Sequence, residues 1–97
     1  MEVIYHRLIQ KDLREALDHY ESEGGTKLAD RFFEEAEAAA ARVAINPQGF
    51  HFQAEDLRRV SLKNFPYHFL YRNLGNTIRI LVLRHDKRHP NFGLRRR

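Results

Sequence analysis

The stretch LRRVSLKNFPYHFLYRNLGNTIRILVLRH, residues 57–85, decides the fold. Within it, apolar and polar residues alternate over 58–63, which is the period of a strand that buries one face. Asn64-Phe65-Pro66 then turns the chain, and the aromatic run at 67–72 favours a second strand. The first part of the stretch therefore predicts two antiparallel strands joined by a short turn.

A third strand completes this part of the sheet. Asn73-Leu74-Gly75-Asn76 is typical of a hairpin turn, and the almost continuously apolar run at 77–85 predicts a central strand. Side chains alternate in direction along the second strand, so His68, Leu70 and Arg72 share one face. The aromatic residues of the opposite face are expected to lie in the core: Tyr67, Phe69 and Tyr71.

Two amphipathic helices precede these strands and form a hairpin. Gly24-Gly25 separates them, because glycine adopts the left-handed conformation that closes a helix at no steric cost, and Asn46-Pro47 ends the second. Both helices carry an apolar stripe at helical period. The first stripe consists of Ile9, Leu13, Ala16, Leu17 and Tyr20, and the second of Leu28, Ala29, Phe32, Phe33, Ala36, Ala39, Ala40 and Val43.

The expected fold is α+β with the order β-α-α-β-β-β. The short β-rich segment Glu2–His6 supplies the first strand, and the mixed segment 48–56 is expected to be a loop fixed by Phe50 and Phe52. The helical hairpin then packs on one face of a small, mostly antiparallel sheet and leaves the other face at least partly free. A length of 97 residues predicts one domain, residues 1–97.

Charge is divided along the chain. Residues 57–97 contain 11 Lys or Arg and a single acid, Asp86, whereas residues 1–56 contain 6 basic and 12 acidic residues. Arginine outnumbers lysine 13 to 4, and its planar guanidinium binds phosphate through two hydrogen bonds. The C-terminal half of this basic protein is therefore expected to present a face that holds phosphate oxygens, with nucleic acid or a nucleic-acid machine as partner.

Composition excludes several classes of protein. The chain has no cysteine, which excludes disulfides, thiolate metal sites and cysteine nucleophiles. Neither predicted helix carries two histidines at the i, i+4 separation, so we expect no metal and no cofactor. No apolar run approaches the roughly 20 residues that cross a bilayer, so we expect no membrane contact and a cytoplasmic location.

Several short segments, in this order and spacing, resemble the RelE/ParE toxin superfamily over nearly the whole chain. These are Asp12-Leu13, Tyr20-Glu21, Leu28–Phe32, Asn46-Pro47, Leu57–Val60, Phe65–Arg72 and His85–Pro90. The resemblance implies the toxin of a type II toxin–antitoxin module, which arrests growth, serves plasmid stabilization and is held inactive by a cognate antitoxin encoded beside it.

Members of this superfamily divide by target. RelE-like members cleave mRNA in the ribosomal A site, whereas ParE-like members lack the cleavage residues and poison DNA gyrase. If the chain is RelE-like, the resemblance implies a metal-independent endoribonuclease whose catalytic residues are His68, Arg88 and Lys63. His68 moves a proton, Arg88 contacts the phosphate and Lys63 lies on the strand that carries lysines in RelE-like enzymes. Each also has a structural interpretation as an exposed side chain on a basic surface.

The C-terminal end favours the ParE-like side slightly. RelE-like enzymes usually place a tyrosine near this end, but the chain offers Phe92, which stacks on a base and cannot transfer a proton. If the chain is ParE-like, it is not an enzyme. The remaining residues expected to bind the target or nucleic acid are Arg59, Arg72, Arg84, His85, Lys87 and Phe92. Arg95–Arg97 is interpreted as a frayed tail.

A function of another class stays open, namely a nontoxic basic binding module or a degenerate toxin. A toxin stops growth when it is induced and a binding module does not. For either toxin type, the antitoxin is expected to lay a helical or extended segment across the groove between the helical hairpin and the sheet.

Overall fold

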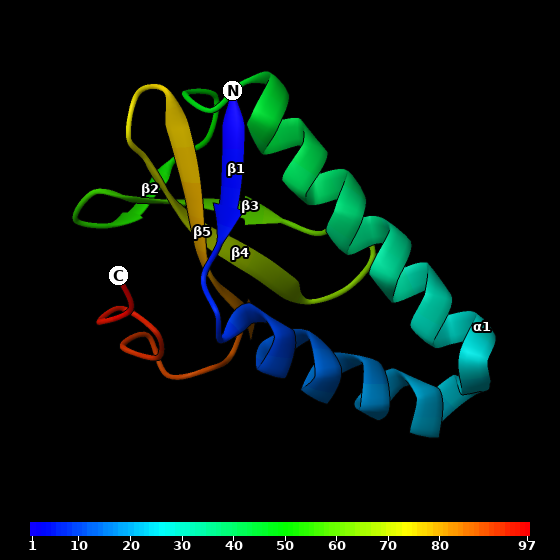
Figure 1. Ribbon diagram of the computed structural model, residues 1–97. Coiled ribbons are helices and arrows are strands. Elements are labelled where there is room, and N and C mark those ends of the chain that lie inside the picture. The colour runs from blue at the N-terminus through cyan, green and yellow to red at the C-terminus, as the bar shows by residue number, and fades with distance from the viewer.

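A helical layer covers one face of a five-stranded sheet in the computed structural model, which describes all residues from 1 to 97 (Figure 1). The sheet has the order β1-β5-β4-β3-β2, in which β1 is parallel to β5 and every other neighbouring pair is antiparallel. This arrangement confirms the predicted α+β class. The elements are β1 Glu2–Tyr5, α1 Ile9–Ile45, β2 Phe52–Ala54, β3 Leu57–Ser61, β4 Tyr67–Asn73 and β5 Thr77–His85.

The helical region α1 consists of two arms that meet at a break. Gly24 (φ −145°, ψ 15°) and Gly25 (φ 78°, ψ −172°) leave helical geometry, and Gly25 adopts the left-handed region that favours glycine. The two arms diverge from this break in Figure 1. The second arm ends at Ile45, and the backbone N–H of the next residue, Asn46, still donates to the carbonyl of Arg42. The predicted helical hairpin is therefore present, joined without a separate loop.

One strand was not predicted. Residues 52–54 of the expected loop form β2, a three-residue edge strand that pairs with β3 through an irregular register. Glu55, with φ 49°, makes the tight connection to β3. So short a strand has no room to show an alternating pattern, and Phe52, at 58 % exposure, contributes little to the core.

The main core lies between α1 and the sheet. Phe32, Val43 and Val60 are fully buried there, together with the expected aromatic face of β4, in which Phe69 and Tyr71 are buried and Tyr67 partly so. The hydroxyl of Tyr71 donates to the carbonyl of Pro47 at 2.6 Å, which satisfies the one polar atom that this ring buries.

A second, smaller core covers the other face of the sheet. Leu57, Leu70, Leu81 and Val82 form it, and Phe92 and Leu94 of the C-terminal segment pack against them. Figure 1 shows this segment on the side of the sheet opposite α1. The segment covers only this part of the face, because Ser61 stays exposed and Arg59 and Arg72 partly so, which agrees with a face that is at least partly free. The expected frayed tail is wrong, because Arg96 forms an ion pair with the buried carboxylate of Asp12.

A substitution at Gly93 tests how tightly the C-terminal segment packs on β5. Its φ is 81°, and an added Cβ would overlap the Cγ atoms of Val82. Gly93→Ala should lower the free energy of unfolding by about 1–3 kcal/mol beyond the backbone cost, measured by urea denaturation. Gly75→Ala is the matched control, because Gly75 also has a positive φ but its Cβ meets no atom within 4 Å. Equal losses in the two variants would contradict tight packing of the segment on β5.

Candidate functional site

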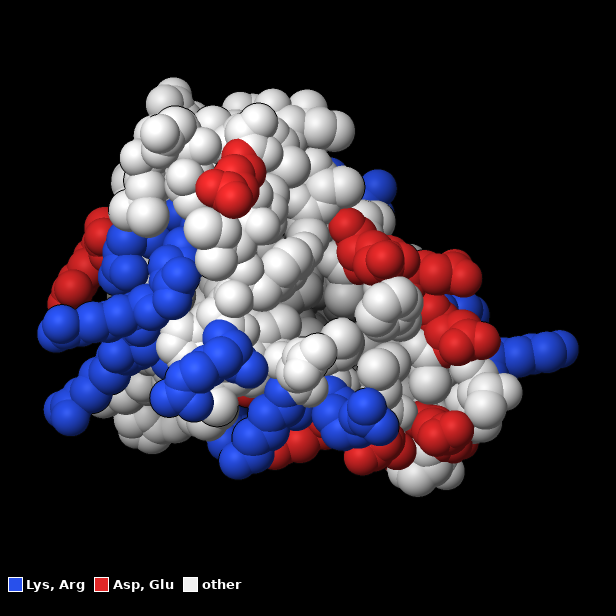
Figure 2. Space-filling model, viewed as in Figure 1, with Lys and Arg blue, Asp and Glu red and all other residues white.

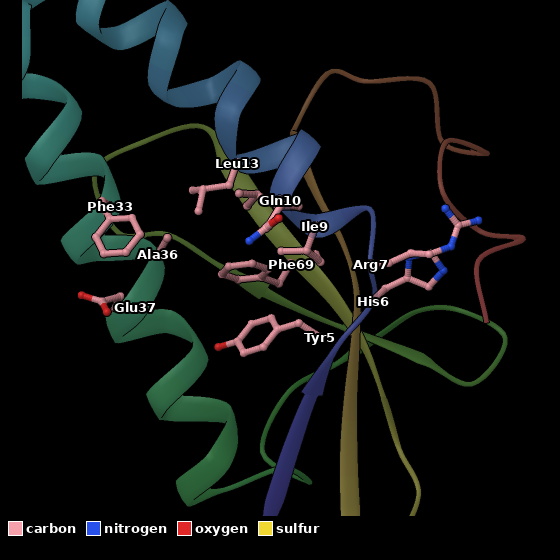
Figure 3. A pocket seen from close by; sticks show the side chains of 11 residues that line it. Tyr5, His6, Arg7, Ile9, Gln10, Leu13, Phe33, Ala36, Glu37 and Phe69 are labelled. Atoms are coloured by element: carbon pink, nitrogen blue, oxygen red, sulfur yellow. The ribbon is translucent and has the colours of Figure 1, made fainter.

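An apolar groove of about 500 Å³ lies between the two arms of α1 and the end of β1 (Figure 3). Ile9 and Leu13 come from the first arm and Phe33 and Ala36 from the second, while the ring of Tyr5 points from β1 toward the second arm. Phe69 of β4 and Leu83 of β5 also line it. Tyr5 is 50 % exposed and Phe33 40 %, and a contiguous exposed apolar surface of this kind marks a site of interaction.

The rim of this groove carries a negative charge on the second arm. Glu37 is exposed beside the ring of Tyr5, and the pKa of the Tyr5 hydroxyl is raised first by burial and then by this carboxylate. His6 and Arg7, which also border the groove, point away from it toward the C-terminal segment in Figure 3. The groove thus offers a partner apolar contacts flanked by an acidic rim.

A second constellation lies under the C-terminal segment, where His68 is 1 % exposed. Nε2 of its ring lies 2.9 Å from Nε of Arg84, and Nδ1 lies 2.8 Å from Oδ1 of Asp86. A guanidinium nitrogen only donates, so Nε2 accepts and the proton resides on Nδ1, which donates to Asp86. Neither ring nitrogen is free for a substrate in this arrangement.

The pKa of His68 is lowered from its usual value, chiefly by burial, which disfavours the charged ring. The hydrogen bond to Asp86 opposes this shift, while the positive charges of Arg59 and Arg84 add to it. The neutral ring inferred from the hydrogen bonds agrees with this direction. Arg59 also contacts Asp86 at 3.1 Å, so four charged or titratable side chains form one connected network.

Arg84 holds the C-terminal segment on the sheet. Its side chain is 5 % exposed, and one terminal nitrogen donates to the carbonyls of Pro90 at 2.8 Å and Phe92 at 3.0 Å. Burial, and then the charge of Arg59, lower the pKa of this guanidinium. Arg84 is predicted from the sequence to bind a target, but in the structure its nitrogens donate to His68 and to the protein's own backbone.

Five other predicted site residues are exposed or partly exposed. Arg72 binds Asp56 at 2.7 Å, and the His85 ring packs edge-on against Tyr67. Lys87 and Arg88 are exposed in the turn after β5, where Arg88 stacks on the ring of Phe92 with 3.9 Å from Cζ to the ring centroid. Lys63 is exposed as well, but β3 ends at Ser61, so the expectation that Lys63 lies on a strand is wrong.

Sequence reasoning missed Asp12 and the terminal arginines. Asp12 is buried at the start of α1, where its carboxylate accepts the backbone N–H of Leu83 and two hydrogen bonds from Arg96. In the sequence, Asp12 is one of several acids of the first helix, with Glu15 and Asp18, and nothing in its spacing distinguishes it from them. The signal that was available is the apolar pair Phe92 and Leu94, which is typical of a segment that packs rather than frays.

Two classes of feature are absent from the structure. No helix combines the length and the apolar character that a membrane span requires. No group of three or more His, Asp or Glu side chains is arranged to hold a metal ion.

Comparison with known proteins adds a family. Residues 3–90 match the sequence profile of a family described as the ParE toxin of type II toxin-antitoxin system, parDE. Toxin ParE2 of Mycobacterium tuberculosis, in the strains CDC 1551 / Oshkosh and ATCC 25618 / H37Rv, is 29 % identical over 87 residues. This alignment covers 89 % of the present chain and 82 % of each relative.

A solved structure shares the fold. A chain of the structure titled "Chromosomal ParDE TA system from P. aeruginosa" superposes with a TM-score of 0.77 at 23 % sequence identity. The superposition covers 88 % of the present chain and 95 % of that chain. At this level of identity the likeness supports the fold alone.

The buried His68 predicts a dependence of stability on pH. Because its folded pKa lies below the unfolded value of about 6.5, the unfolded state binds the proton more readily as pH falls below 6.5. The free energy of unfolding should therefore decrease on acidification, by up to about 1.4 kcal/mol per pH unit for this group. Urea denaturation between pH 7.5 and 5 measures it.

His68→Asn keeps a hydrogen-bond donor toward Asp86 but removes the titrating group, so the free energy of unfolding of this variant should depend less steeply on pH. Part of the pH dependence should remain, because the pKa of His6 is also lowered. His51→Asn, at an exposed position, is the control and should leave the slope unchanged. A His68→Asn variant with the full slope would contradict the buried neutral ring.

Proposed function

The chain belongs to the ParE toxin family of type II toxin–antitoxin systems, and we propose that it arrests growth by inhibiting DNA gyrase until a cognate antitoxin silences it. The proposal places its action in the cytoplasm, where gyrase works. A module of this kind carried on a plasmid stabilises the inheritance of that plasmid.

The hydrogen bonds of His68 are the observation that favours gyrase over the ribosome as the target. Metal-free RNA cleavage needs a group that accepts the proton of the ribose 2′-hydroxyl and a group that protonates the leaving oxygen. Both ring nitrogens of His68 are already hydrogen-bonded, one to Arg84 and one to Asp86. Phe92 has no ionisable group and cannot protonate a leaving oxygen. These observations support inhibition by binding rather than by cleavage, and the chain is then not an enzyme.

The RelE-like alternative rests on the exposed end of β5. Tyr67, His85 and Arg88 line a small cavity of about 80 Å³ there, and Arg88 is the residue expected to contact a phosphate. In this alternative the chain is an mRNA endoribonuclease that works on the ribosome. Replacing Arg88, His68 or Lys63 by alanine should then abolish cleavage.

A binding module with no toxicity is the remaining alternative. It predicts that induction leaves growth unaffected, whereas both toxin mechanisms predict arrest that the antitoxin relieves.

The groove between the arms of α1 fits the antitoxin. Its apolar lining and its half-exposed rim residues Tyr5 and Phe33 match an amphipathic helix or an extended segment that inserts alternate apolar side chains. Such a partner buries apolar surface that the isolated toxin leaves in contact with water. We therefore assign the groove to the antitoxin.

Two assays run side by side test the target. Within minutes of induction, 5′ ends of cellular transcripts are mapped, and in parallel the purified toxin is added to gyrase in a supercoiling assay. Gyrase inhibition predicts transcripts without new codon-phased 5′ ends and blocked supercoiling. Codon-phased 5′ ends together with active gyrase would identify the ribosome as the target instead. Growth arrest without either effect would reject both targets.

Phe33 tests the assignment of the groove. Phe33→Glu places a charge among the apolar contacts at a position that is already 40 % exposed, so the fold should persist. The affinity for the antitoxin should fall by about tenfold or more, as at a buried interface anchor. Calorimetry with the purified antitoxin measures this loss, and in cells the variant should remain toxic when the antitoxin is co-expressed.

Ile45→Glu is the matched control, because Ile45 lies on the same arm, is 84 % exposed and does not line the groove. It should leave affinity and rescue unchanged. Unaltered affinity in Phe33→Glu would place the antitoxin elsewhere.

A further inference from the structure

A second hollow, separate from the apolar groove, lies between the β1–α1 connection and the C-terminal segment. It has a volume of about 780 Å³ and is lined by nine residues, of which two are hydrophobic. Four arginines contribute to it: Arg7 from the connection and Arg95, Arg96 and Arg97 from the end of the chain. We call this hollow the arginine basin.

The fold holds the terminal arginines in place through Arg96. Its guanidinium binds Asp12 through two nitrogens and donates to the carbonyl of Leu81 at 3.0 Å. Arg79 of β5 donates to the backbone carbonyl of Arg97 at 2.5 Å. Arg96 thus faces inward, while Arg95 and Arg97 on either side of it are exposed.

Arg7 faces the same space from the other side. Figure 3 shows its side chain and that of His6 pointing away from the apolar groove, toward the C-terminal segment. The imidazole of His6 is fixed by the backbone N–H of Leu8, which donates to Nδ1 at 3.1 Å. Arginines from the two ends of the chain therefore border one basin.

The basin carries net positive charge that no side chain of the protein neutralises. Asp12 offsets Arg96, but Arg7, Arg95 and Arg97 form no ion pair, and no carboxylate side chain lines the basin. The pKa of His6 is lowered first by burial and then by the charges of Arg96, Arg79 and Arg7. Figure 2 shows blue side chains gathered on the side of the molecule where the C-terminal segment lies, and many of the red ones along α1.

We propose that the arginine basin binds the phosphodiester backbone of duplex DNA. Guanidinium groups bind phosphate oxygens with paired hydrogen bonds, and backbone binding requires charge and donors rather than apolar anchors. An acidic peptide fits less well, because protein interfaces rely on buried apolar and aromatic anchors and the basin has only two hydrophobic lining residues. The choice of duplex DNA rests on the proposed action at gyrase, which works on DNA.

Fluorescence anisotropy of a labelled 20-bp duplex, titrated with the full-length toxin at several salt concentrations, tests the basin directly. The test variant is Arg7→Gln/Arg95→Gln/Arg97→Gln, which spares the structural Arg96. Each lost phosphate contact lowers the slope of log affinity against log salt by about 0.9, so the triple variant should lose about 2–3 in slope. Its affinity should fall at least about tenfold.

The matched control is Arg14→Gln/Lys27→Gln/Arg31→Gln, which removes the same charge from exposed positions on α1. It should change the affinity less than twofold. An equal loss in both triple variants would mean diffuse attraction by net charge and would overturn the proposal, as would an unchanged slope in the basin variant.

Two competing ligands complete the test. Tighter binding of single-stranded RNA than of duplex DNA, or of a poly-glutamate chain than of either, would overturn the assignment to DNA. The assay contains no gyrase, so a toxin that binds DNA through the basin and leaves supercoiling intact would contradict the proposed function alone.

Discussion

The buried guanidinium of Arg84 holds the second face of the sheet together. Burying a cation costs free energy unless its donors are satisfied, and here His68 and the carbonyls of residues 89, 90 and 92 accept them. These bonds fix the start of the C-terminal segment, which lets Phe92 and Leu94 cover Leu70 and its neighbours. Because β4 and β5 are buried on both faces, the apolar residues of this face depend on that segment for their cover.

The arginines of the chain therefore have two roles, because some stabilise the fold and others provide surface charge. Arg84 and Arg96 act inside the protein, where each ties the C-terminal segment to the sheet or to α1. Arg7, Arg95 and Arg97 make no ion pair and contribute to the external positive surface. The division of charge along the sequence predicts that a basic face exists, but it does not distinguish arginines that hold the fold from those that face a partner.

The helical hairpin and strand β3 follow from hydrophobic period, while β4 and β5 follow from an aromatic run and an apolar run that are long enough to predict a strand. The burial of His68 does not follow from the hydrophobic pattern. Alternation along the strand predicts that His68 lies on the face opposite the main core, but not that this face is covered there by the largely polar and basic residues 86–97. The continuous run Leu81-Val82-Leu83 indicates burial on both faces, since a strand with one wet face alternates. Which segment covers this face depends on tertiary packing, and the hydrophobic period of the strands does not predict it.

The apolar groove and the arginine basin lie on opposite sides of the connection between β1 and α1. Tyr5 points into the groove, whereas His6 and Arg7 point toward the basin. A partner confined to the groove therefore leaves Arg95 and Arg97 exposed and cannot silence the toxin by neutralising them. Either such a partner excludes the target by its bulk, or its chain continues past Tyr5 and around the connection with acidic residues for the basin. The fold makes these two modes of inhibition structurally separate, because the groove's lining carries the apolar contacts and the basin carries the charge.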